Sequence, residues 1–217
     1  MQFPNAAAGS KKVFTSEILM LLVAILSGIS LIIAAIGTAG AIASAAETGE
    51  LSGAAFGGLA VAGILGIAVA VISIIALILS IVGIVQCAKD ENSFKAVLIA
   101  LLISLVVNIL QAIFASNTVL ASIADIVNRV ISIFVTCMII QGFCNLADKL
   151  GNEELKTKGK NLILLITVVI VLTIILRIVS SFFVASAILA IVIMILSIIQ
   201  YFVFLIFLNK AKKMLNA

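Results

Sequence analysis

Six long apolar segments, separated by short polar stretches, make up most of the 217-residue chain. They cover about residues 18–46, 57–88, 94–114, 119–146, 162–179 and 187–208. A helix needs about 20 apolar residues to cross the hydrocarbon core of a membrane, and each segment is close to that length or longer. The apolar runs are continuous, as from Leu162 to Leu176, whereas strands of a membrane barrel alternate. The pattern therefore predicts membrane-spanning helices.

The charge content supports the same fold class. Only 10% of the residues are charged and 65% are hydrophobic, whereas a soluble domain carries about 25% charged residues. The six segments leave no room for a separate soluble catalytic domain. We therefore expect an all-α, polytopic helical bundle with six transmembrane helices, forming one integral membrane domain over residues 1–217.

The lysines indicate how the chain is oriented. When the N-terminus is placed in the cytoplasm, all eleven lysines fall on the cytoplasmic side and none on the other. This asymmetry follows the positive-inside rule, so both termini are expected to be cytoplasmic and the protein to lie in the cell membrane. The net charge of +4 is then a topology signal and does not indicate binding to nucleic acid.

The three helical hairpins share a weak sequence pattern at their lysine-rich ends. Each begins with a short basic or polar lead, found at residues 9–12, 92–95 and 158–161. Each ends with a comparable exit, at residues 87–89, 146–149 and 210–213. Three parallel hairpin repeats would explain the pattern, but so would a common preference for lysine and alanine at cytoplasmic helix ends.

A few polar residues lie inside the apolar segments, where such residues are costly and often functional. Six of them form the candidate ligand site: Ser104, Asn108, Gln111, Asp125, Arg129 and Arg177. The first three follow one face of the third segment, and Asp125 and Arg129 are one helical turn apart on the fourth. They suit an outward-facing pocket for a small anionic or zwitterionic ligand. Alternatively, the fourth segment exceeds the hydrocarbon core by roughly two turns, which would place Asp125 and Arg129 in the headgroup region.

Small residues gather in the first two segments. Gly53 and Gly57 have GxxxG spacing, and Ala62, Gly66 and Ala70 have small-xxx-small spacing. Such faces let helix backbones approach closely. We expect them either to pack the first two spans together within one chain or to form a contact with another chain.

Reactive groups are scarce. The chain has no histidine, and its three cysteines, Cys87, Cys137 and Cys144, form no CxxC pair. We expect no metal, no cofactor and no enzymatic activity, and we expect the cysteines to be reduced thiols. Cys87 and Cys144 lie at the expected cytoplasmic ends of spans, where acylation is an option.

Two functions fit these observations. The first is a non-catalytic scaffold, accessory subunit or assembly component that acts through helix packing. Its partner would be either further copies of the same chain or another membrane protein. The alternative is a small-solute transporter or substrate-binding membrane component with a pocket on spans three to five. The size and span count resemble those of the substrate-binding components of vitamin importers, whose pockets contain many aromatic contacts; this chain has no tryptophan and one tyrosine, Tyr201.

Overall fold

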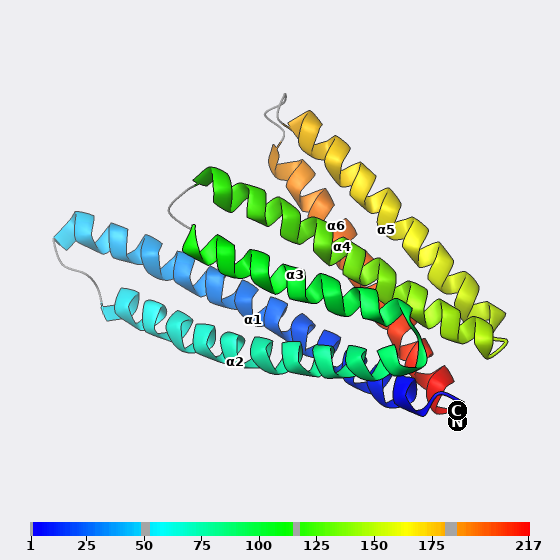
Figure 1. Ribbon diagram of the computed structural model, residues 1–217. Helices are drawn as coiled ribbons and strands as arrows, with labels where there is room; N and C mark the ends of the chain where they lie inside the picture. The colour runs from blue at the N-terminus through cyan, green and yellow to red at the C-terminus, as the bar shows by residue number, and fades with distance from the viewer. Residues whose placement is uncertain (1, 49–52, 115–117, 181–185) are drawn as a thin grey trace. The chain divides into compact units, whose positions relative to one another are not determined.

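The computed structural model of the chain consists of six helices in the part that it describes, with no strand (Figure 1). The described residues are 2–48, 53–114, 118–180 and 186–217, and their side chains are described except at 39–48, 53–59, 118, 119, 121, 122, 125, 173–180, 186–191, 193 and 194. The helices are α1 (Pro4–Thr48), α2 (Gly53–Asp90), α3 (Ser93–Ile113), α4 (Thr118–Lys149), α5 (Glu153–Ser180) and α6 (Ser186–Asn216). The predicted all-α fold class is confirmed.

Five segments of the described helices are long and apolar enough to cross a membrane. They are Pro4–Thr38, Ala60–Asp90, Ser93–Ile113, Ile126–Lys149 and Ile195–Asn216. α5 is not among them, because its first turns are rich in charge and the side chains of its last two turns are not described. The prediction of a helical membrane protein is therefore confirmed.

Several helices extend beyond the apolar segments at the ends that carry lysines. α1 begins at Pro4, well before residue 18, because proline suits the first helical position and Asp90 supplies a cap. The Ala6 N–H donates to the Asp90 carboxylate at 2.7 Å, and the Asn5 amide donates to the same carboxylate at 2.9 Å. A carboxylate at this position also complements the positive end of the helix dipole.

The contacts of the chain divide it into two compact units. Unit 2 is the hairpin formed by residues Thr15–Ile81, and unit 1 contains Met1–Phe14 and Val82–Ala217. In unit 2 the Ser30 hydroxyl donates to the Ala62 carbonyl at 3.2 Å, which links α1 to α2. Most large apolar side chains of unit 2 are exposed, as lipid-facing side chains are.

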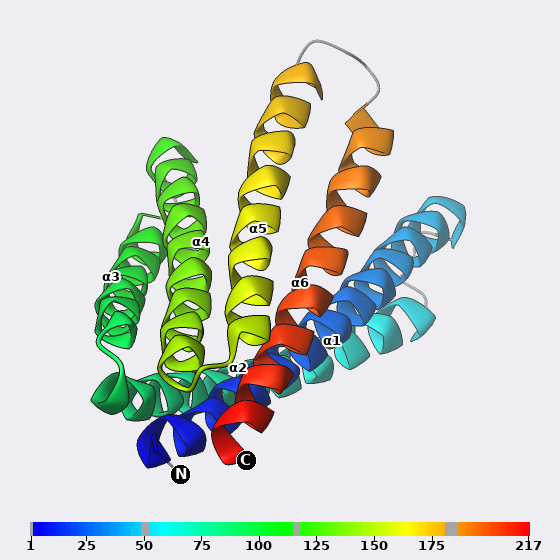
Figure 2. The same cartoon turned by 90° about the vertical axis from the view of Figure 1, so that its right-hand side faces the viewer.

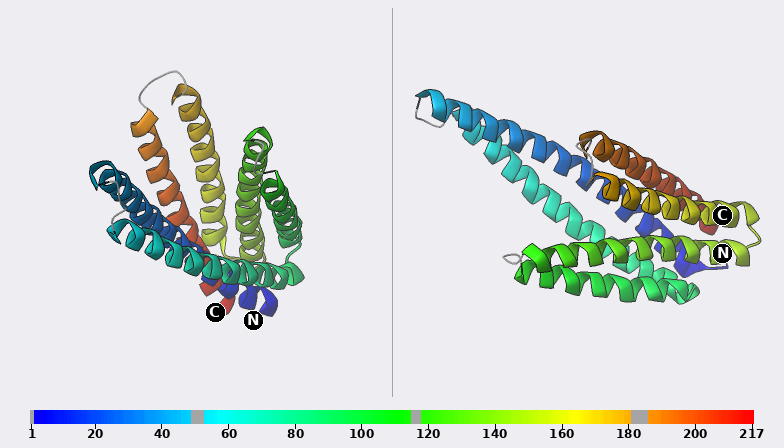
Figure 3. Two further views of the ribbon diagram at one scale, coloured as in Figure 1. Left: turned by 90° about the vertical axis from the view of Figure 1, so that its left-hand side faces the viewer. Right: turned by 90° about the horizontal axis from the view of Figure 1, so that it is seen from above.

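In unit 1, α3 packs along α4, α4 along α5, and α5 along α6. Figures 2 and 3 show α4 and α5 close together near the chain termini and diverging away from them. Hydrogen bonds join the helix ends there: Asn145 to Glu91, and Asn216 to the Ala7 carbonyl. We call this the lysine-rich end, because the first turns of α1, α3 and α5 and the last turns of α2, α4 and α6 carry all eleven lysines.

The buried core of unit 1 is concentrated at the lysine-rich end. The ring of Phe94 meets that of Phe143 edge-on, with the centroids 5.1 Å apart. Other fully buried residues around them are Ala6, Val13, Ile84, Cys87, Ile140, Leu146, Ala147 and Ala211. Toward the other end the helices expose isoleucine, leucine and valine side chains, as expected of helices that face lipid.

A tight turn connects α4 to α5 at the lysine-rich end. Gly151 has a φ of 68°, and the Asn152 N–H donates to the Ala147 carbonyl at 2.8 Å. The Gly151 N–H donates to the backbone carbonyl of Asp148, and the two bonds together form a Schellman motif. The positive φ of this motif is a conformation that glycine adopts readily. The Asn152 side chain then caps α5 by accepting from the Leu155 N–H at 3.0 Å.

Candidate functional site

The polar stripe predicted on α3 meets a single asparagine of α4. Asn128 accepts a hydrogen bond from the Ser104 hydroxyl at 3.2 Å and donates to Asn108 at 2.8 Å and Gln111 at 3.5 Å. All four residues therefore belong to one polar ladder between the two helices. Asn128 is the residue that the sequence analysis missed, and Asn108 is exposed on the helix surface.

The charged members of the predicted pocket are Asp125, Arg129 and Arg177. Arg129 follows Asn128 in α4 and is exposed. The side chains of Asp125 and Arg177 lie outside the described residues, so their part in the predicted site stays a prediction.

A second polar cluster surrounds Glu91 in the turn between α2 and α3. Its carboxylate accepts from the Ser93 hydroxyl at 3.0 Å, the Asn145 amide at 3.1 Å and the Lys149 ammonium at 2.5 Å. Burial raises the pKa of the Glu91 carboxyl, but the hydrogen bonds from Lys149, Asn145 and Ser93 outweigh burial and hold the pKa below its ordinary value. The cluster joins the end of α4 to the α2–α3 turn.

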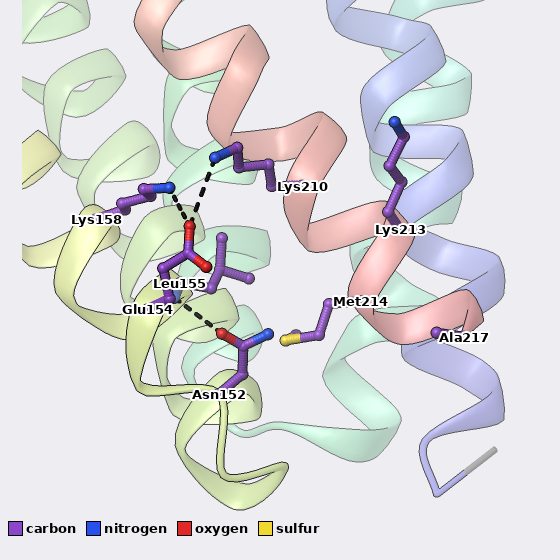
Figure 4. A pocket seen from close by; sticks show the side chains of 8 residues that line it. All are labelled: Asn152, Glu154, Leu155, Lys158, Lys210, Lys213, Met214 and Ala217. Atoms are coloured by element: carbon purple, nitrogen blue, oxygen red, sulfur yellow. Dashed lines mark hydrogen bonds and ion pairs between the residues drawn. The ribbon is translucent and has the colours of Figure 1, made fainter.

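A shallow pocket of about 380 Å³ lies at the lysine-rich end between α5 and α6 (Figure 4). Its lining includes Glu154 and Lys158 from the first turns of α5, and Lys210 and Lys213 from the last turns of α6. Figure 4 shows Lys158 and Lys210 pointing toward the Glu154 carboxylate from opposite sides. This basic pocket was not predicted, because its α5 lysine lies more than 50 positions from its two α6 lysines in the sequence.

The small residues predicted to pack helices lie in unit 2. The surroundings of Gly53 and Gly57 lie outside the described residues. Ala62 is half-buried, and its carbonyl accepts the hydrogen bond from Ser30. Gly66 and Ala70 are exposed, and a Cβ added at Gly66 would meet no atom within 4 Å.

Among the glycines whose surroundings the structure describes, the closest contacts lie in unit 1. A Cβ added at Gly83 would stand 2.8 Å from the Gly9 carbonyl oxygen and 2.9 Å from the Val13 nitrogen. A Cβ at Gly142 would press on the Phe94 ring, and one at Gly159 would overlap the Cys144 sulfur. Three helix contacts at the lysine-rich end therefore depend on the absence of a side chain.

The cysteines are free thiols, as predicted, but two of them are inaccessible. Cys87 is fully buried, and Cys144 is 3% exposed. The Cys87 thiol donates to the Ala6 carbonyl at 3.8 Å, and the Cys144 thiol donates to the Lys156 carbonyl at 3.7 Å. Acylation of either sulfur would require the surrounding helices to separate.

Among the residues that the structure describes, no three histidine, cysteine, aspartate or glutamate side chains come close enough to hold a metal ion. Comparison with protein-family models, curated proteins and solved structures finds no match to this chain. The functional assignment therefore depends on the geometry of the polar ladder and of the lysine-rich end.

Proposed function

We propose that the chain is a non-catalytic multi-pass membrane protein that acts through helix packing, as a scaffold, accessory subunit or assembly component. The polar ladder is the observation that carries the proposal. Ser104, Asn108 and Gln111 all hydrogen-bond to Asn128 and so join α3 to α4. Polar residues that satisfy one another across two helices act as packing contacts in a membrane.

The exposed position of Asn108 favours a further helix beside the ladder. α3 has 21 residues and a length of about 31 Å, close to the thickness of the hydrocarbon core. Asn108 lies five residues before its end, and an amide exposed to lipid at that depth is costly. A transmembrane helix of another chain would cover it, and a second copy of this chain is the partner to test first.

Solute transport is the alternative, and it requires the same polar residues to face a ligand. With Asn128 as their partner, Ser104, Asn108 and Gln111 would have to exchange these hydrogen bonds for contacts with the solute. Replacing both Arg129 and Arg177 by leucine would abolish stabilisation by a transported anion such as a carboxylate, whereas a packing role predicts no ligand-dependent shift in a screen of small anions.

Self-association in a bilayer is the direct test. Labelled protein is reconstituted at low density, and the subunits in each spot are counted by photobleaching. We expect oligomers for the native chain and roughly 3- to 20-fold weaker association for Asn108→Leu, the range that corresponds to one interhelical hydrogen bond. Ile109→Leu, at a neighbouring exposed apolar position, serves as the control. A strictly monomeric native chain that also copurifies with no partner in several mild detergents would contradict the proposal.

We further propose that the lysine-rich end faces the cytoplasm, which places both termini there. Gln2 and Ala217 are exposed and suit single cysteine substitutions, whereas native Cys87 and Cys144 are too buried to report topology. With a membrane-impermeant maleimide, Gln2→Cys and Ala217→Cys should be labelled only after cells are permeabilised, with the native chain giving the background. Equal labelling of intact cells would reverse the orientation.

We also propose six spans, with α5 crossing the membrane over its apolar residues 162–179, and an internal duplication. Two similar contacts, one within the first hairpin and one between the second and the third, join a hairpin start to a hairpin end and so accompany the repeated lead and exit residues. The Cys87 thiol donates to the carbonyl three residues before Gly9, and the Cys144 thiol donates to the carbonyl three residues before Gly159. In each pair a Cβ on the glycine would collide with the cysteine sulfur. An experimental structure in which the three hairpins fail to superpose would refute the duplication.

A further inference from the structure

The pocket between α5 and α6 contains more positive than negative charge. Three lysines line it, Lys158, Lys210 and Lys213, against one acidic side chain, Glu154, so that the lining side chains carry a formal charge of +2. Lys158 donates to Glu154, and the Lys210 nitrogen lies 3.8 Å from the same oxygen. One carboxylate thus serves two ammonium groups that come from different helices.

Lys156, in the first turns of α5, differs because its charge is already balanced. Lys156 pairs with Asp148 at 2.6 Å and with Glu153 at 3.1 Å. Lys213, by contrast, takes part in none of the ion pairs that the described residues form, and in Figure 4 it extends along α6. Its four side-chain bonds let the ammonium group swing toward the pocket. The uncompensated charge is therefore concentrated at Lys210 and Lys213.

An apolar strip continues from these lysines along α6 into the membrane-spanning segment. Ile206, Val203 and Ile199 precede Lys210 at intervals of three or four residues, so they share its helix face. They are 58%, 37% and 52% exposed. The strip offers a place for an acyl chain directly beside a place for an anion, and Leu155 and Met214 give the pocket itself an apolar side.

We propose that this pocket binds the phosphate group of an anionic phospholipid, with Lys210 and Lys213 as its principal cationic contacts and Lys158 as a third. The phosphate oxygens would accept from the ammonium groups, and the acyl chains would lie on the α6 strip. Glu154 competes with the phosphate for Lys158 and Lys210. A soluble phosphate compound offers the same anionic group but makes no use of the apolar strip.

The experiment uses the full chain in mild detergent and measures its thermal stability with three probes: phosphatidylglycerol, phosphatidylcholine and inorganic phosphate. We expect stabilisation by phosphatidylglycerol alone. Lys210→Gln combined with Lys213→Gln should weaken the apparent affinity roughly 30-fold, given the contribution of a lysine near an anionic surface. Glu154→Gln should strengthen it, because the competing carboxylate is removed.

Lys89→Gln combined with Lys95→Gln is the matched control, since both are exposed lysines of the same end and the change in net charge is identical. Equal loss of affinity in this control would overturn the site, as would unchanged affinity in the Lys210 and Lys213 double variant. Equal stabilisation by inorganic phosphate and phosphatidylglycerol would overturn the lipid assignment and indicate a soluble phosphate compound. None of these outcomes depends on self-association, so the site and the proposed function can fail independently.

Discussion

Replacing Gly83 by alanine is expected to lower the unfolding temperature of the protein, although alanine favours helix over glycine by about 1 kcal/mol. The added Cβ would stand 2.8 Å from the Gly9 carbonyl oxygen and 2.9 Å from both the Val13 nitrogen and a Val13 methyl group. Two of these atoms belong to the backbone of α1 and cannot move by a side-chain rotation. The helices must separate, and we expect a net loss of about 2 kcal/mol.

The buried thiols supply the measurement. The chain has no tryptophan, but Cys87 and Cys144 react with a fluorogenic maleimide only when the helices around them open, because both are buried. Gly66→Ala is the control, since the same substitution there meets no atom within 4 Å. It should leave the transition unchanged or raise it. Equal unfolding temperatures for Gly83→Ala and the native chain would mean that the contact between α1 and α2 at Gly83 is not tightly packed.

The glycines show what a sequence can and cannot say about helix packing. GxxxG spacing at Gly53 and Gly57 marks a smooth helix face, but the spacing does not say whether another helix lies on it. Gly66, in the small-xxx-small series that follows, faces open space, whereas Gly83, which has no glycine partner four residues away, meets Gly9. The crossing point of two helices depends on their relative register, and register is a property of the folded pair.

For the polar ladder, too, one part could be predicted from the sequence and another part could not. Helical spacing alone predicts that Ser104, Asn108 and Gln111 share one face of α3. It does not identify Asn128, because a single asparagine on α4 has no periodic pattern and its partners lie on another helix. The fold class was predictable from apolar segment length, which the membrane thickness sets. Helix ends were not, because α1 continues to Pro4 through residues that the membrane does not constrain.

The largest electrostatic effect is expected at Glu91, where alanine should lower the free energy of unfolding by about 2 kcal/mol. The substitution removes the acceptor for Ser93, Asn145 and Lys149 at once. The Glu91 side chain is 9% exposed, while that of Lys149 is 49% exposed. Water can therefore replace part of the interaction that the Lys149 ammonium group loses when Glu91 is removed. Glu154→Ala is the control. That carboxylate also pairs with lysine, but its side chain is 74% exposed, and little change is expected in the thiol-reactivity transition.

The pH dependence of the free energy of unfolding separates what the charge of Glu91 contributes to stability from what its shape and hydrogen bonds contribute. Because the folded protein holds the pKa of Glu91 below the ordinary 4.5, the ionised carboxylate stabilises the fold above that pH, and this stabilisation is lost as the pH falls through the lowered pKa. Glu91→Gln keeps an acceptor for Ser93 and Asn145 but not the charge opposite Lys149. The native chain should therefore be more stable than Glu91→Gln at neutral pH, and the difference should shrink below pH 4.5. A difference independent of pH would show that shape and hydrogen bonding, without the ion pair, hold the α2–α3 turn against α4.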